Sequence, residues 1–306
     1  MMTKTRIAIA TTLLLASGAA SANNMYLDLG SLSALSGNDY DAGRFIGTPD
    51  ANTATATFTE FGFSQMLATS IYDYSDGSPL GSFYDTNITS ELSAAGLPTS
   101  GTALDGTSTV TLVMPDCAGG QCDIDALSPL VPPLGTDNEG FLQTWDLQVE
   151  YHFDGILNAG GPVYTGGYFN VYFNSLGSFD GDPVDGMLVL SGNLTGSDLQ
   201  AANLDLFFDI QTALDGFLWI DNGSEYIDAG LNDLDSGTTD PATLVLDTNV
   251  NPPIPTADQL LLVGNNVIRQ ATLDGSVTAQ IPEPSTIALL GLGMLGLGAG
   301  MRRRRS

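Results

Sequence analysis

The strongest constraint on the fold is a two-residue alternation of apolar and polar side chains near the middle of the chain. Polar residues separate the apolar members of this run, which are Trp145, Leu147, Val149, Tyr151 and Phe153. Successive side chains of a β-strand point to opposite faces of a sheet. The pattern therefore predicts a strand with one buried face and one face in water.

A second alternating run follows closely and predicts a hairpin. Phe169, Val171 and Phe173 alternate with polar or amphipathic residues. Residues 158–162, which read Asn-Ala-Gly-Gly-Pro, form a turn signal between the two runs. Two alternating runs joined by such a turn are typical of antiparallel strands.

The remaining runs predict an all-β domain, an antiparallel β-sandwich or a jelly-roll-like fold. Helical signals are few, at 91–95 and 197–202, and crossovers long enough for a parallel sheet are missing. No fixed-period repeat indicates a solenoid or a propeller. The further β-like runs are 53–61, 80–88, 107–114, 187–194, 204–210, 216–221, 242–246 and 267–279.

The first 22 residues have the pattern of a secretory signal peptide. Lys4 and Arg6 give a basic start, an apolar stretch covers 7–15, and Ala20-Ser21-Ala22 is a small-residue cleavage site. The apolar stretch is too short to span a bilayer, which disfavours a membrane anchor. We therefore expect export by the Sec pathway and cleavage by signal peptidase after Ala22, rather than a buried N-terminal helix.

The other end of the chain carries a proline-flanked acid, an apolar segment and a basic block, in that order. Pro282, Glu283 and Pro284 precede a glycine-rich apolar run at 287–301. A basic block directly after an apolar span holds that end on the cytoplasmic side of a membrane. The block consists of Arg302, Arg303, Arg304 and Arg305. Its position after an apolar span accounts for these arginines without a role in nucleic-acid binding.

This arrangement resembles the PEP-CTERM sorting signal of Gram-negative bacteria, over residues 281–306. The resemblance implies processing at Pro282-Glu283-Pro284 by an exosortase-type enzyme. It implies a transmembrane sorting helix that anchors the protein transiently in the inner membrane, before it reaches the cell surface or the extracellular matrix. It also implies a link to exopolysaccharide and to biofilm or floc formation. A permanent tail anchor is the alternative. We expect three parts: the signal peptide 1–22, an extracellular domain 23–280 and the sorting signal 281–306.

The extracellular domain is highly acidic once both end segments are set aside. Of 35 acidic residues in the chain, only Glu283 lies outside 23–280, which leaves 34. Of 8 basic residues, six lie in the end segments, which leaves Arg44 and Arg269 and a net charge near −32. Such a charge excludes nucleic acid and anionic membranes as direct partners and favours divalent cations.

The two cysteines, Cys117 and Cys122, stand five positions apart with a Gly-Gly pair between them. An exported protein passes through an oxidising compartment, so we expect a local disulfide. Two cysteines and a distant His152 do not supply a zinc site. The spacing also differs from the C-x-x-C of redox-active pairs.

Catalytic signals are weak, and we assign no catalytic residue. His152, the only histidine, falls on the polar face of the best strand. No Gly-x-Ser-x-Gly elbow, P-loop or dinucleotide fingerprint accompanies it. Glu150 is the best-placed carboxylate for glycoside hydrolysis, but with so many acids any pair could be proposed.

Calcium binding has a stronger motif. Asp180, Asp182 and Asp185 lie in one glycine-bearing loop, and hard cations prefer clustered carboxylates. Shorter versions occur at 233–237 and 39–43. The alternative is ordinary turn chemistry, because Asp and Gly favour turns.

A row of tyrosines is the last candidate site. Tyr164, Tyr168 and Tyr172 are expected on one side of a strand, where aromatic faces beside amide donors could contact glycan; the alternative is ordinary cross-strand pairing. The leading hypothesis is a non-enzymatic, exopolysaccharide-associated surface or matrix protein bridged by Ca²⁺ or Mg²⁺. A carbohydrate-binding module and a secreted glycan hydrolase or lyase are the alternatives.

Overall fold

The structure is a computed structural model of the chain, and it describes most of the expected extracellular domain. In the part of the chain that it describes, no helix is both long enough and apolar enough to cross a bilayer. The described residues are 22–32, 53–112, 126–129, 139, 141, 145–175, 186–201, 203–230, 242–250 and 252–281.

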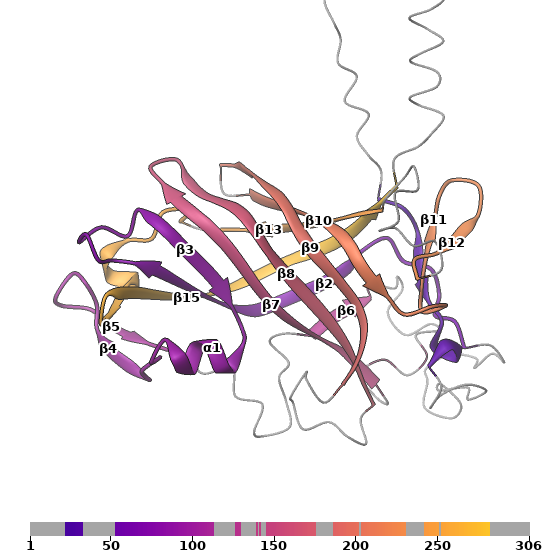
Figure 1. The fold of residues 1–306 in the computed structure, drawn as a ribbon, viewed down its shortest axis with the longest axis horizontal. Coiled ribbons are helices and arrows are strands. Elements are labelled where there is room, and N and C mark those ends of the chain that lie inside the picture. The colour runs from indigo at the N-terminus through magenta and orange to yellow at the C-terminus, as the bar shows by residue number, and fades with distance from the viewer. Residues whose placement is uncertain are drawn as a thin grey trace, which may run out of the picture.

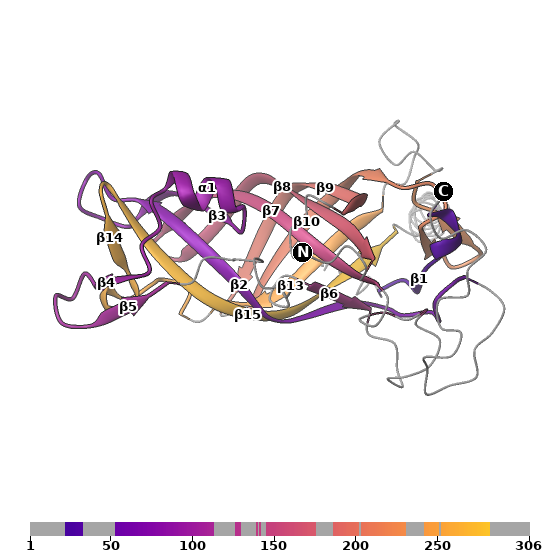
Figure 2. The same cartoon turned by 90° about the horizontal axis from the view of Figure 1, so that it is seen from below.

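One large antiparallel sheet dominates the described residues and closes on itself (Figure 1). Neighbouring strands pair around a ring of eight, and the last strand returns to pair with the first, β15 with β2. Figure 2 shows these two strands side by side. In ring order the strands are β2 (Phe61–Asp73), β3 (Gly81–Thr86), β7 (Trp145–Asn158), β8 (Gly161–Ser175), β9 (Met187–Gln200), β10 (Asn203–Ala213), β13 (Thr243–Asn249) and β15 (Asn266–Gln280).

Two short strands complete the ring where its members do not reach each other. β6 (Ala126–Pro129) pairs with both β2 and β7 beyond the end of β3. β14 (Leu261–Val263) pairs with the start of β15, where β13 does not extend. Both strands therefore cover backbone groups that an open edge would expose.

Smaller elements lie at the two ends of the closed sheet (Figure 1). A three-stranded sheet at one end consists of β1 (Met25–Leu27), β11 (Leu218–Asp221) and β12 (Tyr226–Asp228). The other end carries α1 (Thr89–Ala94) and the hairpin β4 (Ser100–Thr102) with β5 (Thr109–Thr111). Single 3₁₀ turns are present at Leu29–Ser31 and Ala257–Gln259.

Apolar residues from alternate positions fill the inside of the closed sheet. The members predicted from β7 are all buried there, with Trp145 fully inaccessible to solvent. Phe208 of β10 contacts Phe153 and Phe169 across the interior, with ring centroids 5.4 Å and 5.1 Å apart. Burial of such rings is the main stabilising contribution that a fold of this type offers.

A second, smaller core lies outside the sheet, beneath α1. Ile71 of β2 and Ile268 of β15 point outward and pack with Leu92 of α1, Leu112 and Leu261. This outer cluster explains why β2 and β15 do not show clean alternation, since both faces of their paired segments are covered.

The prediction of an all-β, antiparallel domain is confirmed. The 158–162 turn joins β7 and β8 as a hairpin, with Asn158 opposite Gly161. Two local predictions are wrong. The run 53–61 forms only isolated bridges at Ala54 and Phe58 before β2 begins. Where a helical turn was predicted at 197–202, residues 197–200 are instead the end of β9, because pairing with β10 supplies their backbone hydrogen bonds.

Candidate functional site

A row of near-parallel rings lies on the outer face of three neighbouring strands. We call it the outer aromatic row: Tyr84 of β3, His152 of β7 and Tyr168 of β8. The ring centroids of Tyr84 and His152 are 5.2 Å apart at 19°, and those of His152 and Tyr168 are 6.1 Å apart at 17°. Tyr168 is 37% exposed, so the row reaches solvent.

Sheet pairing brings these rings together. His152 stands directly opposite Tyr168 in the β7–β8 ladder, and Tyr84 stands opposite Asp154, two residues further along β7. Side chains at opposite and diagonal positions on one face are within contact distance. His152, which lies on the polar face predicted for the strand 145–153, is therefore the central member of this row.

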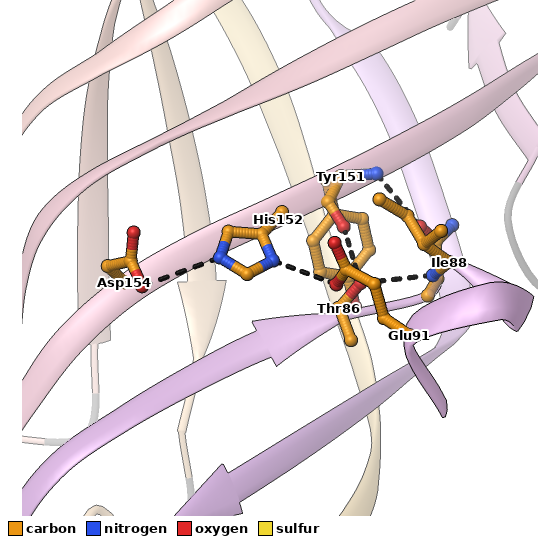
Figure 3. A network of polar contacts seen from close by, with 7 residues as sticks. Thr86, Ile88, Glu91, Tyr151, His152 and Asp154 are labelled. Carbon is orange, nitrogen blue, oxygen red and sulfur yellow. Dashed lines mark hydrogen bonds and ion pairs between the residues drawn. The ribbon is translucent and has the colours of Figure 1, made fainter. Parts of the chain in front are cut away.

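Carboxylates flank the central histidine (Figure 3). His152 Nδ1 lies 2.8 Å from Glu91 Oε2, and its Nε2 lies 3.4 Å from Asp154 Oδ1. Partial burial lowers the pKa of His152, but the hydrogen bond and the charge of Glu91, followed by Asp154, outweigh it, so the net pKa is raised above its usual value. The folded protein therefore stabilises the imidazolium form relative to the unfolded chain.

The turn from β3 into α1 positions Glu91. The Thr86 hydroxyl donates to the Tyr151 carbonyl (3.1 Å) and accepts from the Ile88 N–H (3.0 Å), as Figure 3 shows. Asn87 adds a second tie to β7: its Oδ1 accepts from the Tyr151 N–H at 2.8 Å. These bonds fasten the start of α1 to β7, so Glu91 in the first helical turn faces His152.

A third carboxylate, that of Glu150, accepts hydrogen bonds from two polar side chains of β8 beside the row. Glu150 Oε2 accepts from the Tyr172 hydroxyl at 3.2 Å and from Asn170 Nδ2 at 3.4 Å. Burial, followed by the charge of Glu150, raises the pKa of Tyr172 to about 12. Tyr172 thus stays a neutral donor at ordinary pH, and this patch offers both donors and acceptors to a polyhydroxylated ligand.

The expected three-tyrosine row is wrong in one member. Tyr168 and Tyr172 lie on the outer face, but Tyr164 is 8% exposed and points inside the closed sheet. The reason is a β-bulge: Gly155 pairs with Tyr164 and Asp154 pairs with Gly166, so Thr165 is an extra residue. Because of this one extra residue, the side chains before it point to the face opposite to the one that two-residue counting from Tyr168 predicts.

Several predicted site residues lie outside the described residues. They include the sorting signal with Pro282, Glu283 and Pro284, the basic block 302–305 and all of the signal peptide except Ala22. They also include the predicted disulfide and calcium ligands, which are Cys117, Cys122, Asp180, Asp182 and Asp185. Among the described residues, no group of three or more His, Cys, Asp or Glu side chains is arranged so that it could hold a metal ion.

Both ring nitrogens of His152 lie beside acidic side chains. Within the described part of the chain, its ring nitrogens contact two carboxylates and no hydroxyl or thiol. Nucleophilic catalysis by a histidine base needs such a group within hydrogen-bond distance. Three members of the site, Tyr84, Glu91 and Asp154, were not singled out from the sequence, although Tyr84 and Glu91 lie in runs predicted correctly as β-strand and helix.

The comparison with known families concerns the C-terminal end. Residues 280–305 match the model of the PEP-CTERM protein-sorting motif. The chain carries a PEP-CTERM sorting signal. The motif indicates an exported protein that is processed by an exosortase and held by a membrane-anchored sorting tail before its release to the surface. No curated protein and no solved structure matches the chain.

Because the chain has one histidine, the effect of Glu91 on the pKa of His152 can be measured without overlap from other imidazoles. We expect the imidazole of His152 to titrate above its ordinary pKa, and Glu91→Gln to lower that midpoint. A raised folded-state pKa stabilises the fold below the unfolded pKa, and this contribution is lost as pH rises through the folded pKa. Proton NMR of the imidazole C–H resonances of this histidine, followed as the pH is varied, checks this.

Asp154→Asn serves as the matched control for that titration. Its contact with His152 is longer, 3.4 Å, and its side chain is 62% exposed, so we expect a smaller downward change than for Glu91→Gln. An equal or larger effect of Asp154→Asn would contradict the assignment of Glu91 as the main carboxylate partner of His152.

Proposed function

We propose that the protein is a non-enzymatic component of the cell surface or extracellular matrix that binds exopolysaccharide in biofilms or flocs. The outer aromatic row and the Glu150 patch beside it are the proposed glycan contacts. The single observation that carries the proposal is the row itself, three near-parallel rings on an exposed sheet face with carboxylates at their edges. The sorting signal, which indicates export and exosortase processing, supports the proposal because polysaccharide would be available to a protein released to the surface.

The chemistry of this surface suits sugar hydroxyls. Glu150 and Asp154 can accept hydrogen bonds, while Asn170 and Tyr172 can donate them. Tyr168 adds an apolar ring at the exposed end of the row, and its hydroxyl remains protonated because burial and Glu150 raise its pKa. Aromatic side chains with polar tips are effective contacts for amphipathic ligands.

Divalent cations are the second proposed partner. A domain with 34 acidic and two basic residues repels copies of itself and acidic polysaccharide alike. Ca²⁺ or Mg²⁺ held between carboxylates would reduce that repulsion. The loop with Asp180, Asp182 and Asp185 remains the proposed calcium site.

Binding of the processed protein to polysaccharide from the producing bacterium tests the proposal. We expect Tyr168→Ala to weaken binding in a co-sedimentation assay by about tenfold, as loss of an interface hot spot does. Tyr226→Ala is the matched control, since Tyr226 is also a partly exposed, ring-contacting tyrosine but lies in β12. Added Ca²⁺ should strengthen binding, and chelator should weaken it.

Two outcomes would contradict the proposal. Equal loss with Tyr168→Ala and Tyr226→Ala would remove the outer aromatic row as the glycan contact. Release of new reducing ends or unsaturated sugars from the polysaccharide would favour the competing hypothesis, a secreted hydrolase or lyase.

A further inference from the structure

Three aromatic rings gather on one face of the three-stranded sheet formed by β1, β11 and β12. Tyr26 and Trp219 stand directly opposite each other in the β1–β11 ladder and stack with ring centroids 5.8 Å apart. Tyr226 of β12 crosses Tyr26 at 5.0 Å and 63°. All three side chains are partly exposed, whereas their neighbours along β1 and β11 are buried in the core. We call these three rings the end cluster.

The sorting tail leaves the domain beside the end cluster. β15 ends at the end of the closed sheet next to which β11 and β12 lie (Figure 1). Asn23 joins these parts: its Nδ2 donates to the Asp221 carbonyl at 2.7 Å, and its Oδ1 accepts from the Ile281 N–H at 3.0 Å. Asp221 in turn pairs with Tyr226 in the β11–β12 ladder. Ile281, the last described residue, is therefore fixed close to the end cluster.

The sequence after Ile281 limits how far the end cluster can lie from a membrane. Only residues 282–286 separate Ile281 from the apolar run of the sorting signal, which begins at Ile287. Six fully extended residue steps cover at most about 22 Å. Ile281 is 8% exposed and hydrogen-bonded, so this reach does not increase unless the end of the fold opens. While the tail is anchored, this end of the domain is thus held at the membrane surface.

The chemistry of the end cluster fits the interfacial layer of a bilayer. Tryptophan and tyrosine are the side chains enriched where membrane meets water. The indole N–H of Trp219 already donates to the Gly216 carbonyl at 2.9 Å, so this ring presents apolar surface outward. Tyr26 and Tyr226 combine an apolar ring with a hydroxyl tip, which suits contact with lipid head groups.

The neighbouring carboxylates decide which lipid surface fits. Asp28, Asp221 and Asp228 each accept a hydrogen bond from a glycine N–H two residues further along the chain, at 2.8–2.9 Å. These acids therefore have local structural partners, and their charges repel an anionic lipid surface. A zwitterionic head-group layer avoids that repulsion. The crossed rings also provide no flat platform like the outer aromatic row, which disfavours a second glycan site.

We propose that the end cluster docks on a zwitterionic phospholipid surface while the sorting tail is anchored. A contact of three rings is weak by itself, but a short tether gives an effective concentration in the millimolar range. Docking keeps Glu283 and its flanking prolines at the head-group layer until the exosortase cuts the chain. Cutting removes the tether, and the weak contact then releases the domain. This surface is separate from the outer aromatic row and does not depend on glycan binding.

Quenching by brominated lipid tests the docking, because the chain has two tryptophans and only Trp219 belongs to the end cluster. The chain from Asn23 to Ser306 is reconstituted through its sorting tail in vesicles of brominated phosphatidylcholine. We expect the vesicles to quench part of the wild-type emission. Trp219→Phe should abolish this quenching, because Trp145 is fully inaccessible inside the closed sheet. The emission maximum of Trp145 checks that each variant is folded.

Two tyrosine variants separate the end cluster from the rest of the surface. Tyr26→Ser combined with Tyr226→Ser should reduce the quenching about fivefold, as loss of central contact residues does. Tyr168→Ala, in the outer aromatic row, is the matched control and should leave the quenching unchanged. A chain that ends at Pro284 should show no quenching at the same lipid concentration, because it lacks the tether.

Several outcomes overturn the proposal. They are an unquenched wild type, quenching that persists in Trp219→Phe, and equal losses with Tyr168→Ala and the double tyrosine variant. Quenching of the chain that ends at Pro284 to the wild-type level would remove the role of the tether. Replacing part of the lipid with phosphatidylglycerol should weaken the quenching through charge repulsion. Stronger quenching with this anionic lipid would overturn the assignment of a zwitterionic surface.

Discussion

Gly167→Ala is expected to destabilise the fold by more than about 3 kcal/mol. Gly167 has a φ of +129°, a conformation that side chains with a Cβ rarely adopt. A Cβ there would also lie 2.7 Å from the Phe153 Cα and still closer to the His152 carbonyl oxygen. Neither contact can be relieved without moving the backbone of β7. Urea unfolding of the purified variant measures the loss.

Gly166→Ala is the matched control, one residue away in the same strand. An added Cβ at Gly166 meets nothing within 4 Å, and its φ is not in the positive range. We expect a change of less than about 1 kcal/mol, toward greater stability if any, because alanine restricts the unfolded chain. Similar losses for both variants would mean that the strand tolerates neither substitution for a reason other than the bulge.

The bulge before Gly167 also marks the limit of what the sequence predicts. Alternation in 145–153 and 169–173 correctly predicted β7, β8 and their hairpin, since buried-face periodicity is a local property. The same rule placed Tyr164 beside Tyr168, because Gly166 and Gly167, a residue type that often marks a bulge inside a strand, do not by themselves say that one residue is extra. Two-residue counting fails at the point where a bulge inserts a residue.

Closure of the sheet is another feature that alternation could not reveal. β2 and β15 are separated by most of the domain, and their pairing joins Asp73 to Asn266 and Phe61 to Val277. A single sequence carries no signal for such a long-range partner. Both strands are also covered on their outer face by the cluster around Leu92, so their patterns are less regular. The all-β class was predictable; the ring was not.

The candidate site was predictable only in part, because strand faces follow from local alternation whereas contacts between distant elements do not. His152, Tyr168 and Tyr172 were named from the polar faces of two predicted strands, and they do lie together. Glu91 approaches from α1 through the Thr86 and Asn87 bonds, which depend on tertiary contacts. Asp85 looked like one acid among many, and only its buried position distinguishes it.

Asp85→Asn is expected to stabilise the protein above pH 6 and to have no such effect near pH 4. Burial raises the pKa of Asp85 to about 6 from an ordinary 3.8. The folded state therefore holds this proton more tightly than the unfolded state, so wild-type stability falls as pH rises between those values. The difference corresponds to about 3 kcal/mol at most. Unfolding in urea from pH 4 to pH 8 measures it.

The opposite sign is expected at Asp105, which provides the control. Hydrogen bonds from the side chain and backbone of Ser108 and from the Thr107 N–H hold the pKa of Asp105 well below its usual range. A depressed pKa stabilises the folded state at neutral pH and loses that effect in acid, so Asp105→Asn should destabilise the protein at pH 7. Subtracting wild type from each variant removes the background of the other carboxylates. If Asp85→Asn and Asp105→Asn shift stability in the same direction at pH 7, burial does not raise the pKa of Asp85 as expected.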